Sequence, residues 1–406
     1  MIIKLVLFLL CLTKVGFGFY DSQAWLDLLY YEKTKEGYKS LTSSSAFFIS
    51  KNGSVDPKKE YLESLVKVKL QDNTFKQRFP LRYKLIALHN NIEYLPIVDI
   101  KKDLNKAMIV FPNRYMGNPA SMFGHLFILL ESEYGIYHSD IVHFVADASS
   151  AAGLGYVISG LSGKFKGEFV TDRYYKKIKE YSYSEDRDIS FYKLSLSVDQ
   201  IYELQLHIKE LQNINFDYYF LEKNCAYFIA KLLNNISKED IRLSSLIVLP
   251  SDVINDLNRT NRLTQSYFRP SATELFNSYY NNLSFKEKKA VKSLIYKPHS
   301  TGEFSSASLK TFLYVSNYAI HNFSNYDDII RKNRLYAYKT LSGNSESFNR
   351  PSLSYLSPVK RIYSRYLELN YESDGNYRLL FNPISYGNLD EFSSLHTKKI
   401  SVLAPS

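Results

Sequence analysis

Beyond its N-terminal apolar segment, the chain contains a single cysteine, Cys225, so the folded protein cannot close an internal disulfide. The other cysteine, Cys11, lies inside the apolar segment. A chain of 406 residues is long enough for two or three domains that each bury a hydrophobic core. The one remaining thiol is therefore either a small packing residue or a reactive group.

The residues around Cys225 predict that it begins a helix. It follows Asn224, where a polar segment gives way to apolar residues at helical spacing, among them Phe228, Ile229 and Leu232. Unpaired N–H groups in a first helical turn favour an anion, and therefore a thiolate over a thiol. Buried cysteines on helices are also common as plain packing residues, so both interpretations stay open at this point.

Residues 1–18 have the pattern of a signal peptide. Lys4 supplies the positive start, an apolar run follows, and Gly16 and Gly18 supply small residues at a cleavage site. The run is well short of the ~20 residues that a membrane-spanning helix needs, and no later stretch reaches that length. We therefore expect export to the periplasm.

The charge and the aromatic content fit a protein that works beside a membrane. The formal net charge is +10, or +8 without Lys4 and Lys14, and there are 35 tyrosines. Scattered basic residues without a nucleic-acid motif favour anionic membrane or envelope surfaces as partners and argue against nucleic acid. Most individual lysines are equally explained as solvated positions on helix faces.

Hydrophobic patterning divides the rest of the chain into four stretches and predicts an α+β protein. Residues 19–99 are expected to be mainly helical, 100–260 mixed, 261–345 helical and 346–406 β-rich. Buried strands are predicted at 108–111, 126–130, 141–145 and 188–196. Ser197 and Gln200 form a capping box at the start of a further helix.

His125 is the candidate partner for the cysteine. It stands at the entry to the predicted strand 126–130, where a sheet would hold its ring as a general base requires. A third polar group usually orients such a ring, and His143 on the next strand is the candidate, with His138 behind it. A histidine at a strand start is also commonly a structural residue. About 100 residues separate His125 from Cys225, so only the fold can bring them together.

Other chemistries find little support. There is no second mature cysteine and no His-Glu-x-x-His motif, so neither a metal nor a cofactor is expected. No Gly-x-Ser-x-Gly motif supports a serine hydrolase, and Gly153 and Gly155 are not followed by the Gly-Lys-Ser/Thr of a phosphate loop.

Segments in order along residues 100–260 resemble the motifs of the Lnb-type lipoprotein acyltransferase family. They are residues 119–125 (Pro-Ala-Ser-Met-Phe-Gly-His), 160–169, 174–181 with Arg187-Asp188, 216–225 (ending in Asn-Cys) and 248–252. Residues 19–97 resemble the domain that precedes these motifs in many Gram-negative members.

The resemblance implies a circularly permuted papain-like fold with the histidine before the cysteine, as in the lecithin–retinol acyltransferase group. It implies transfer of an acyl chain from the diacylglyceryl group of a lipoprotein to its N-terminal amine, through a thioester on Cys225. His125 would be the base and later the acid, and His143 stands where many relatives have asparagine. The candidates for holding the substrate or the oxyanion are Asn224, Ala226, Ser121 and Tyr219.

Three questions stay open from the sequence. The apolar loop over residues 151–167 is predicted either to admit the acyl chain, through Leu154, Tyr156, Leu161 and Phe165, or to be an ordinary surface loop. The enzyme is either an acyltransferase using a lipoprotein or phospholipid donor, or a cell-wall peptidase or amidase of the same fold; an envelope scaffold is the non-enzymatic alternative. The strands after Pro351 either open an outer-membrane barrel, which would place the protein at the inner face of that membrane, or close a small sheet. The sequence does not indicate an oligomeric state.

Overall fold

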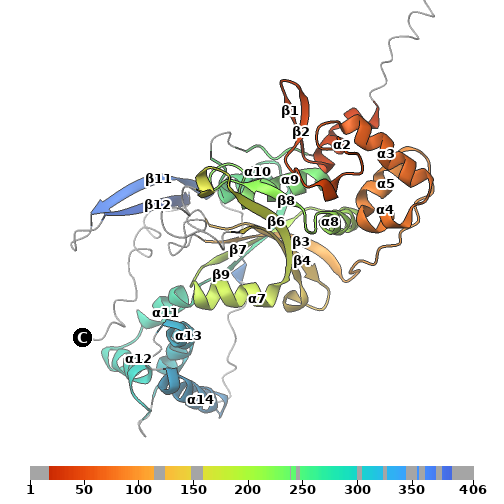
Figure 1. Ribbon diagram of the computed structural model, residues 1–406. Helices are drawn as coiled ribbons and strands as arrows, with labels where there is room; N and C mark the ends of the chain where they lie inside the picture. The colour runs from red at the N-terminus through yellow and green to blue at the C-terminus, as the bar shows by residue number, and fades with distance from the viewer. Residues whose placement is uncertain are drawn as a thin grey trace, which may run out of the picture. The chain divides into compact units, whose positions relative to one another are not determined.

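The computed structural model describes residues 18–113, 124–147, 159–237, 239–243, 247–299, 304–322, 327–343, 354–355, 362–371 and 377–385. These residues form helices and antiparallel strands, so the predicted α+β class is confirmed (Figure 1). The chain divides into two compact units. The first comprises Met1–Lys102, Phe144–Val170 and Ser197–Ile241, and the second Asp103–His143, Thr171–Leu196 and Arg242–Ser406. The signal-peptide residues 1–17 lie outside the described residues.

The first unit joins the N-terminal helices to two later helices. Its helical segments are η1 (Phe19–Asp21), α2 (Gln23–Leu28), η2 (Ser45–Phe47), α3 (Pro57–Lys69), α4 (Asn73–Arg78), α5 (Pro80–His89), α8 (Val198–Glu210) and α9 (Cys225–Ser237). Its strands are the hairpin β1 (Tyr31–Thr34) and β2 (Gly37–Ser40), and the antiparallel pair β6 (Phe165–Arg173) and β8 (Asn215–Tyr218). The capping box predicted for Ser197 and Gln200 is confirmed at the start of α8. The hairpin is a departure from the mainly helical N-terminal stretch that the sequence predicts.

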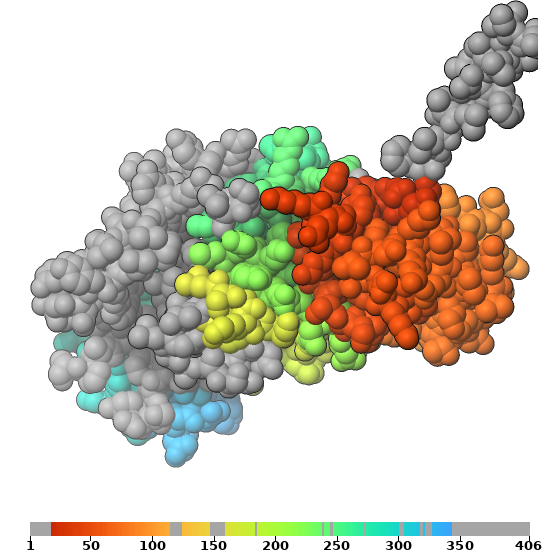
Figure 2. Space-filling view, turned by 45° about the horizontal axis from the view of Figure 1, so that its top comes forward, coloured from red at the N-terminus to blue at the C-terminus, as the bar shows by residue number. Residues whose placement is uncertain are grey.

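Aromatic side chains from distant parts of the sequence form one core in this unit. Phe228 of α9 stacks on Phe144 with ring centroids 4.0 Å apart and lies 4.9 Å from Phe216 of β8. Tyr30, from the N-terminal segment, lies 5.0 Å from the same Phe216 ring. Figure 2 shows the N-terminal residues in red and orange with green side chains of later residues directly beside them. Residues 18–102 therefore share a core with α8, β8 and α9 instead of packing as a separate body.

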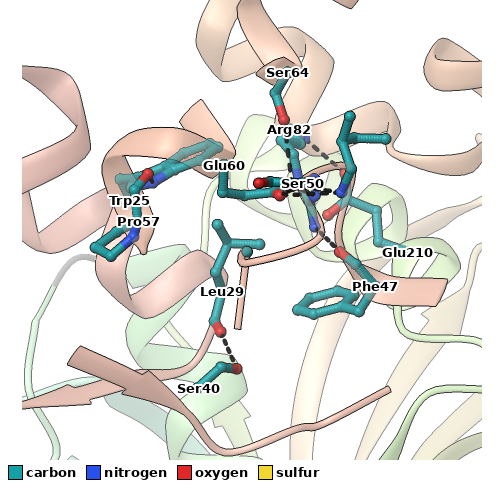
Figure 3. Close-up of polar contacts among 12 residues, drawn as sticks. Trp25, Leu29, Ser40, Phe47, Ser50, Pro57, Glu60, Ser64, Arg82 and Glu210 are labelled. Atoms are coloured by element: carbon teal, nitrogen blue, oxygen red, sulfur yellow. Dashed lines mark hydrogen bonds and ion pairs between the residues drawn. The ribbon is translucent and has the colours of Figure 1, made fainter. Parts of the chain in front are cut away.

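A buried ion pair joins α3 to α5, and one of its residues also contacts α8 (Figure 3). Arg82 of α5 and Glu60 of α3 are both fully buried, with a guanidinium nitrogen 2.8 Å from a carboxylate oxygen. Arg82 also donates to the carbonyl oxygen of Phe47, at 3.0 Å. Its backbone N–H donates to the carboxylate of Glu210, at the end of α8, at 2.7 Å. The N-terminal helices and α8 are thus joined by a hydrogen bond to a buried carboxylate as well as by apolar packing.

The second unit is built on antiparallel strands in the order β10-β9-β7-β3-β4-β5. They are β3 (Leu104–Pro112), β4 (Phe127–Ser132), β5 (Asp140–Asp147), β7 (Ile189–Leu194), β9 (Leu263–Arg269) and β10 (Ser354–Tyr355). The strands predicted at 108–111, 126–130, 141–145 and 188–196 are confirmed as β3, β4, β5 and β7, whereas β9 was not predicted. The unit also contains the helical segments η4 (Ile136–His138), α7 (Tyr174–Lys179), η5 (Glu180–Ser184) and α10 (Pro250–Arg259).

Helix α7 covers one face of this sheet. Tyr174, Ile178 and Tyr181 pack in one buried cluster with residues of β3, β4, β5 and β7. A separate core joins the helices α11 (Ala272–Tyr280), α12 (Phe285–Tyr296), α13 (Ser306–Asn322) and α14 (Asp327–Gly343). Within the stretch 261–345 that the sequence predicts to be helical, β9 is a departure. The predicted C-terminal strands are confirmed as the antiparallel pair β11 (Ile362–Tyr371) and β12 (Tyr377–Ser385).

Candidate active site

Cys225 is the first residue of α9, as the sequence predicts, and Asn224 caps the helix. The side-chain oxygen of Asn224 accepts the backbone N–H groups of Ala226 at 3.0 Å and Tyr227 at 3.2 Å. Its side-chain nitrogen donates to the carbonyl oxygen of Phe220, at 3.1 Å. The thiol is therefore held at the positive end of the helix dipole, in a side chain that is buried.

The segment before Cys225 packs against the glycine-rich loop. Phe220 donates its backbone N–H to the carbonyl oxygen of Gly160 at 2.9 Å, and Tyr219 donates to that of Lys223 at 3.1 Å. Gly163 has a φ of +71°, and a Cβ atom there would lie 2.2 Å from the ring of Tyr219. This position requires glycine because both the backbone conformation and the close approach of Tyr219 exclude a side chain.

The predicted oxyanion roles of Asn224 and Ala226 remain predictions. In the structure the Asn224 amide and the Ala226 N–H serve the helix cap. Asn224 accepts the Ala226 N–H, which would have to exchange this partner to bind an oxyanion. Ser121, the other candidate for contacting substrate, lies outside the described residues.

His125 and His143 lie together in the second unit. Their ring centroids are 6.1 Å apart and the rings are nearly perpendicular. His143 on β5 is paired in register with Phe127 on β4, two residues after His125. The backbone N–H of His125 donates to the carbonyl oxygen of Pro112 at the end of β3, at 3.3 Å. Adjacent strands therefore fix both histidines at one end of the β3–β4–β5 sheet.

Burial keeps both imidazoles neutral at physiological pH. It lowers the pKa of His125 well below the ordinary value of 6.5, and electrostatic interactions with His143, Arg187 and Lys177 lower it further. Burial, followed by the charge of Lys177, lowers the pKa of His143 to about 4. Nε2 of His143 is buried and has no hydrogen-bond partner in the part of the chain that the structure describes. A neutral His125 is the protonation state that a general base needs.

Arg187 is a residue of this site whose role the sequence did not reveal. It is buried, donates to the carbonyl oxygen of Pro112 at 2.9 Å, and also donates to that of Asn113. Its guanidinium lies over the Tyr181 ring, 4.9 Å from the centroid. Arg187 therefore fixes the end of β3 from which His125 is held. It falls in a segment that resembles a family motif, but nothing in the local pattern indicates a buried arginine.

The residues predicted on the lipid-facing loop have different outcomes. Leu161 is exposed, at 51%. Phe165 is a correction, because it is buried in β6, paired with Tyr218, with its ring 5.9 Å from that of Phe220. The alternation of β6 turns its ring into the core, so it does not face lipid. Leu154 and Tyr156 lie outside the described residues.

Replacing His143 by asparagine is expected to flatten the pH dependence of stability. Because the pKa of His143 is about 4 in the folded protein and 6.5 in an unfolded chain, the unfolded chain binds more protons between these values. The free energy of unfolding therefore falls as the pH drops, by about 2 kcal/mol between pH 7 and pH 5. Urea unfolding at both pH values should show that H143N loses this part of the slope. An unchanged slope would contradict the assignment; His138→Gln, at an exposed position, is the control.

In the described residues there is no group of three or more histidine, cysteine, aspartate or glutamate side chains that could hold a metal ion. Within the same residues, no helix combines the length and the apolar character needed to cross a membrane. The fold and these residues define an α+β protein with a cysteine at a helix start in one unit and a histidine pair at a sheet end in the other.

Residues 97–260 match the family model of the Lnb N-terminal periplasmic domain, and this region of the chain therefore belongs to the Lnb-type family. The resemblance that the sequence motifs indicate is confirmed. Residues 18–89 match a domain of unknown function, DUF7843. No curated protein and no solved structure matches the chain. The family description supports the predicted location in the periplasm.

Proposed function

We propose that this protein is a periplasmic thiol acyltransferase that acts on the acyl chains of lipoproteins or phospholipids. Cys225 is the nucleophile and His125 the general base and acid, in a circularly permuted papain-like domain. The observation that carries the proposal is a cysteine at the first residue of a capped helix, inside a region that belongs to the Lnb-type family.

In the first step His125 accepts the thiol proton as the sulfur of Cys225 attacks the carbonyl carbon of the sn-2 ester. The resulting oxyanion collapses, the ester C–O bond breaks, and the protonated imidazole gives its proton to the leaving alkoxide. In the second step an amine attacks the thioester, His125 accepts the amine proton, and the C–S bond breaks. The thiolate takes the proton back, and the products are an amide and the free enzyme.

The thioester partitions between the amine and water, so transfer requires that the amine is held close and that water is excluded. The burial of Cys225 supports a site with little water. His143 is proposed to orient the His125 ring, because their rings are 6.1 Å apart. The exposed Leu161 is proposed to border the acyl chain.

The test is incubation of the full chain in detergent with a fluorescent diacylated lipopeptide, followed by mass analysis of peptide and protein. Intramolecular transfer leaves the peptide mass unchanged but moves one acyl group to the N-terminal amine in the fragment spectrum. Hydrolysis instead lowers the peptide mass by one acyl group. An acyl adduct on the Cys225 peptide would identify the thioester. If C225A transfers the acyl group as the wild type does, the proposal is wrong; cleavage of peptidoglycan stem peptides in its place would favour the amidase alternative.

A further inference from the structure

One carboxylate of the N-terminal domain holds both sides of the cysteine turn. Glu32, on β1, accepts a hydrogen bond from the Tyr227 hydroxyl at 2.6 Å. Its other oxygen lies 3.1 Å from the ammonium nitrogen of Lys223. Lys223 is two residues before Cys225 and Tyr227 is two residues after it. Glu32 belongs to the segment that matches the domain of unknown function. Its side chain therefore links the residues on either side of Cys225 and lies outside the helix that Cys225 begins.

The local electrostatics keep this bridge charged. Burial raises the pKa of Glu32, but the hydrogen bond from Tyr227 and the charge of Lys223 outweigh it, so the pKa is lowered overall. Tyr227 is held from the other side as well, because its backbone N–H is bound by the Asn224 cap and Lys231 lies over its ring. The carbonyl oxygen of Lys223 accepts the N–H of Tyr219. Both residues that Glu32 binds are thus parts of the network that shapes the turn.

We infer that Glu32 is a positioning residue for Cys225, and that holding the cysteine turn is what the N-terminal domain contributes to the reaction. This inference rests on the proposed role of Cys225 as the nucleophile. Glu32 acts through Lys223 and Tyr227, which fix the ends of the turn while Asn224 caps the helix between them. A half-exposed ion pair with no such role would contribute little. A positioning role instead predicts that removing Glu32 changes the reactivity of the Cys225 thiol.

The test compares E32A and E32Q with the wild-type full chain. In E32A the turn opens more often, so alkylation of the buried Cys225 by iodoacetamide is expected to rise about fivefold at a pH where the thiol is ionised. The kcat for acyl transfer is expected to fall by a similar factor with little change in KM, because the thiol is misplaced and not the substrate. E32Q keeps an acceptor for Tyr227 and should lie between E32A and the wild type. Peptide mass analysis separates Cys225 from Cys11.

Asp217→Asn is the matched control, because it removes an exposed ion pair with Lys166 in the same unit without touching the turn. Alkylation of E32A within a factor of two of D217N would overturn the inference. If E32A does not fold, Tyr227→Phe removes the same hydrogen bond from the helix side and is judged by the same criterion. If the wild type transfers no acyl group while E32A still alkylates faster, the proposed function fails and the positioning role stands.

Discussion

Replacing His125 by glutamine is expected to slow acyl transfer by about 10³-fold, because the thiol loses the group that accepts its proton. The backbone N–H of His125 binds the carbonyl oxygen of Pro112 and its ring lies beside His143, so the sheet fixes the backbone that carries the ring. Single-turnover transfer from a diacylated lipopeptide measures the loss. His138→Gln, which changes an exposed histidine on η4, is expected to retain the wild-type rate. Equal rates for H125Q and H138Q would remove His125 from the mechanism.

The same residue sets the expected pH dependence. Since burial and the positive charges around it hold the pKa of His125 well below 6.5, the ring stays neutral as the pH falls through 6.5. The acid limb of kcat/KM in the wild type is therefore expected to lie below pH 6.5, and transfer falls only when the ring becomes protonated. Because kcat/KM reports the pKa values of the free enzyme, an acid limb above pH 6.5 would show that His125 is not the base.

Much of the fold could be predicted from the sequence because the starts and ends of many helices and strands are encoded by neighbouring residues. The strand β3 follows from a run of apolar residues ending at Pro112, and α8 follows from the capping box at Ser197. Asn224 and Cys225 at the start of α9 follow from the change to helical spacing. The short strands β1, β2 and β8, of four residues each, carry too little periodicity to be predicted. Their pairing depends on contacts with residues far along the chain.

The candidate site likewise contains residues that the local sequence indicates and residues that it does not. Its reactive residues could be proposed because a cysteine at a helix start and a histidine at a strand start are visible in the sequence. The residues that hold them, Arg187 and Glu32, could not, because each acts on backbone or side chains many positions away. Phe165 was assigned to the wrong environment for a related reason. An apolar residue beside a glycine-rich loop looks the same in sequence whether it faces lipid or a core.

The buried ion pair between α3 and α5 gives the largest expected effect on stability. Arg82→Met is expected to lower the free energy of unfolding by about 3–5 kcal/mol, because it leaves the Glu60 carboxylate buried without its counter-charge. Both side chains are fully buried, so water cannot replace the guanidinium. Urea unfolding of the full chain measures the loss. Lys67→Met breaks an ion pair with Asp72 that is partly exposed, and it should cost no more than about 1 kcal/mol.

A second change separates the charge from the loss of packing. In the double variant Arg82→Met with Glu60→Gln neither charge of this pair remains, so part of the lost stability should return. The amide can still accept one of the N–H groups of Ile49 and Ser50 that now bind Glu60. If R82M alone unfolds within about 1 kcal/mol of the wild type, the ion pair is not what joins α3 and α5. Because the Arg82 N–H binds Glu210 on α8, an intermediate in which residues 18–102 unfold while α8 and α9 stay folded would contradict the single shared core.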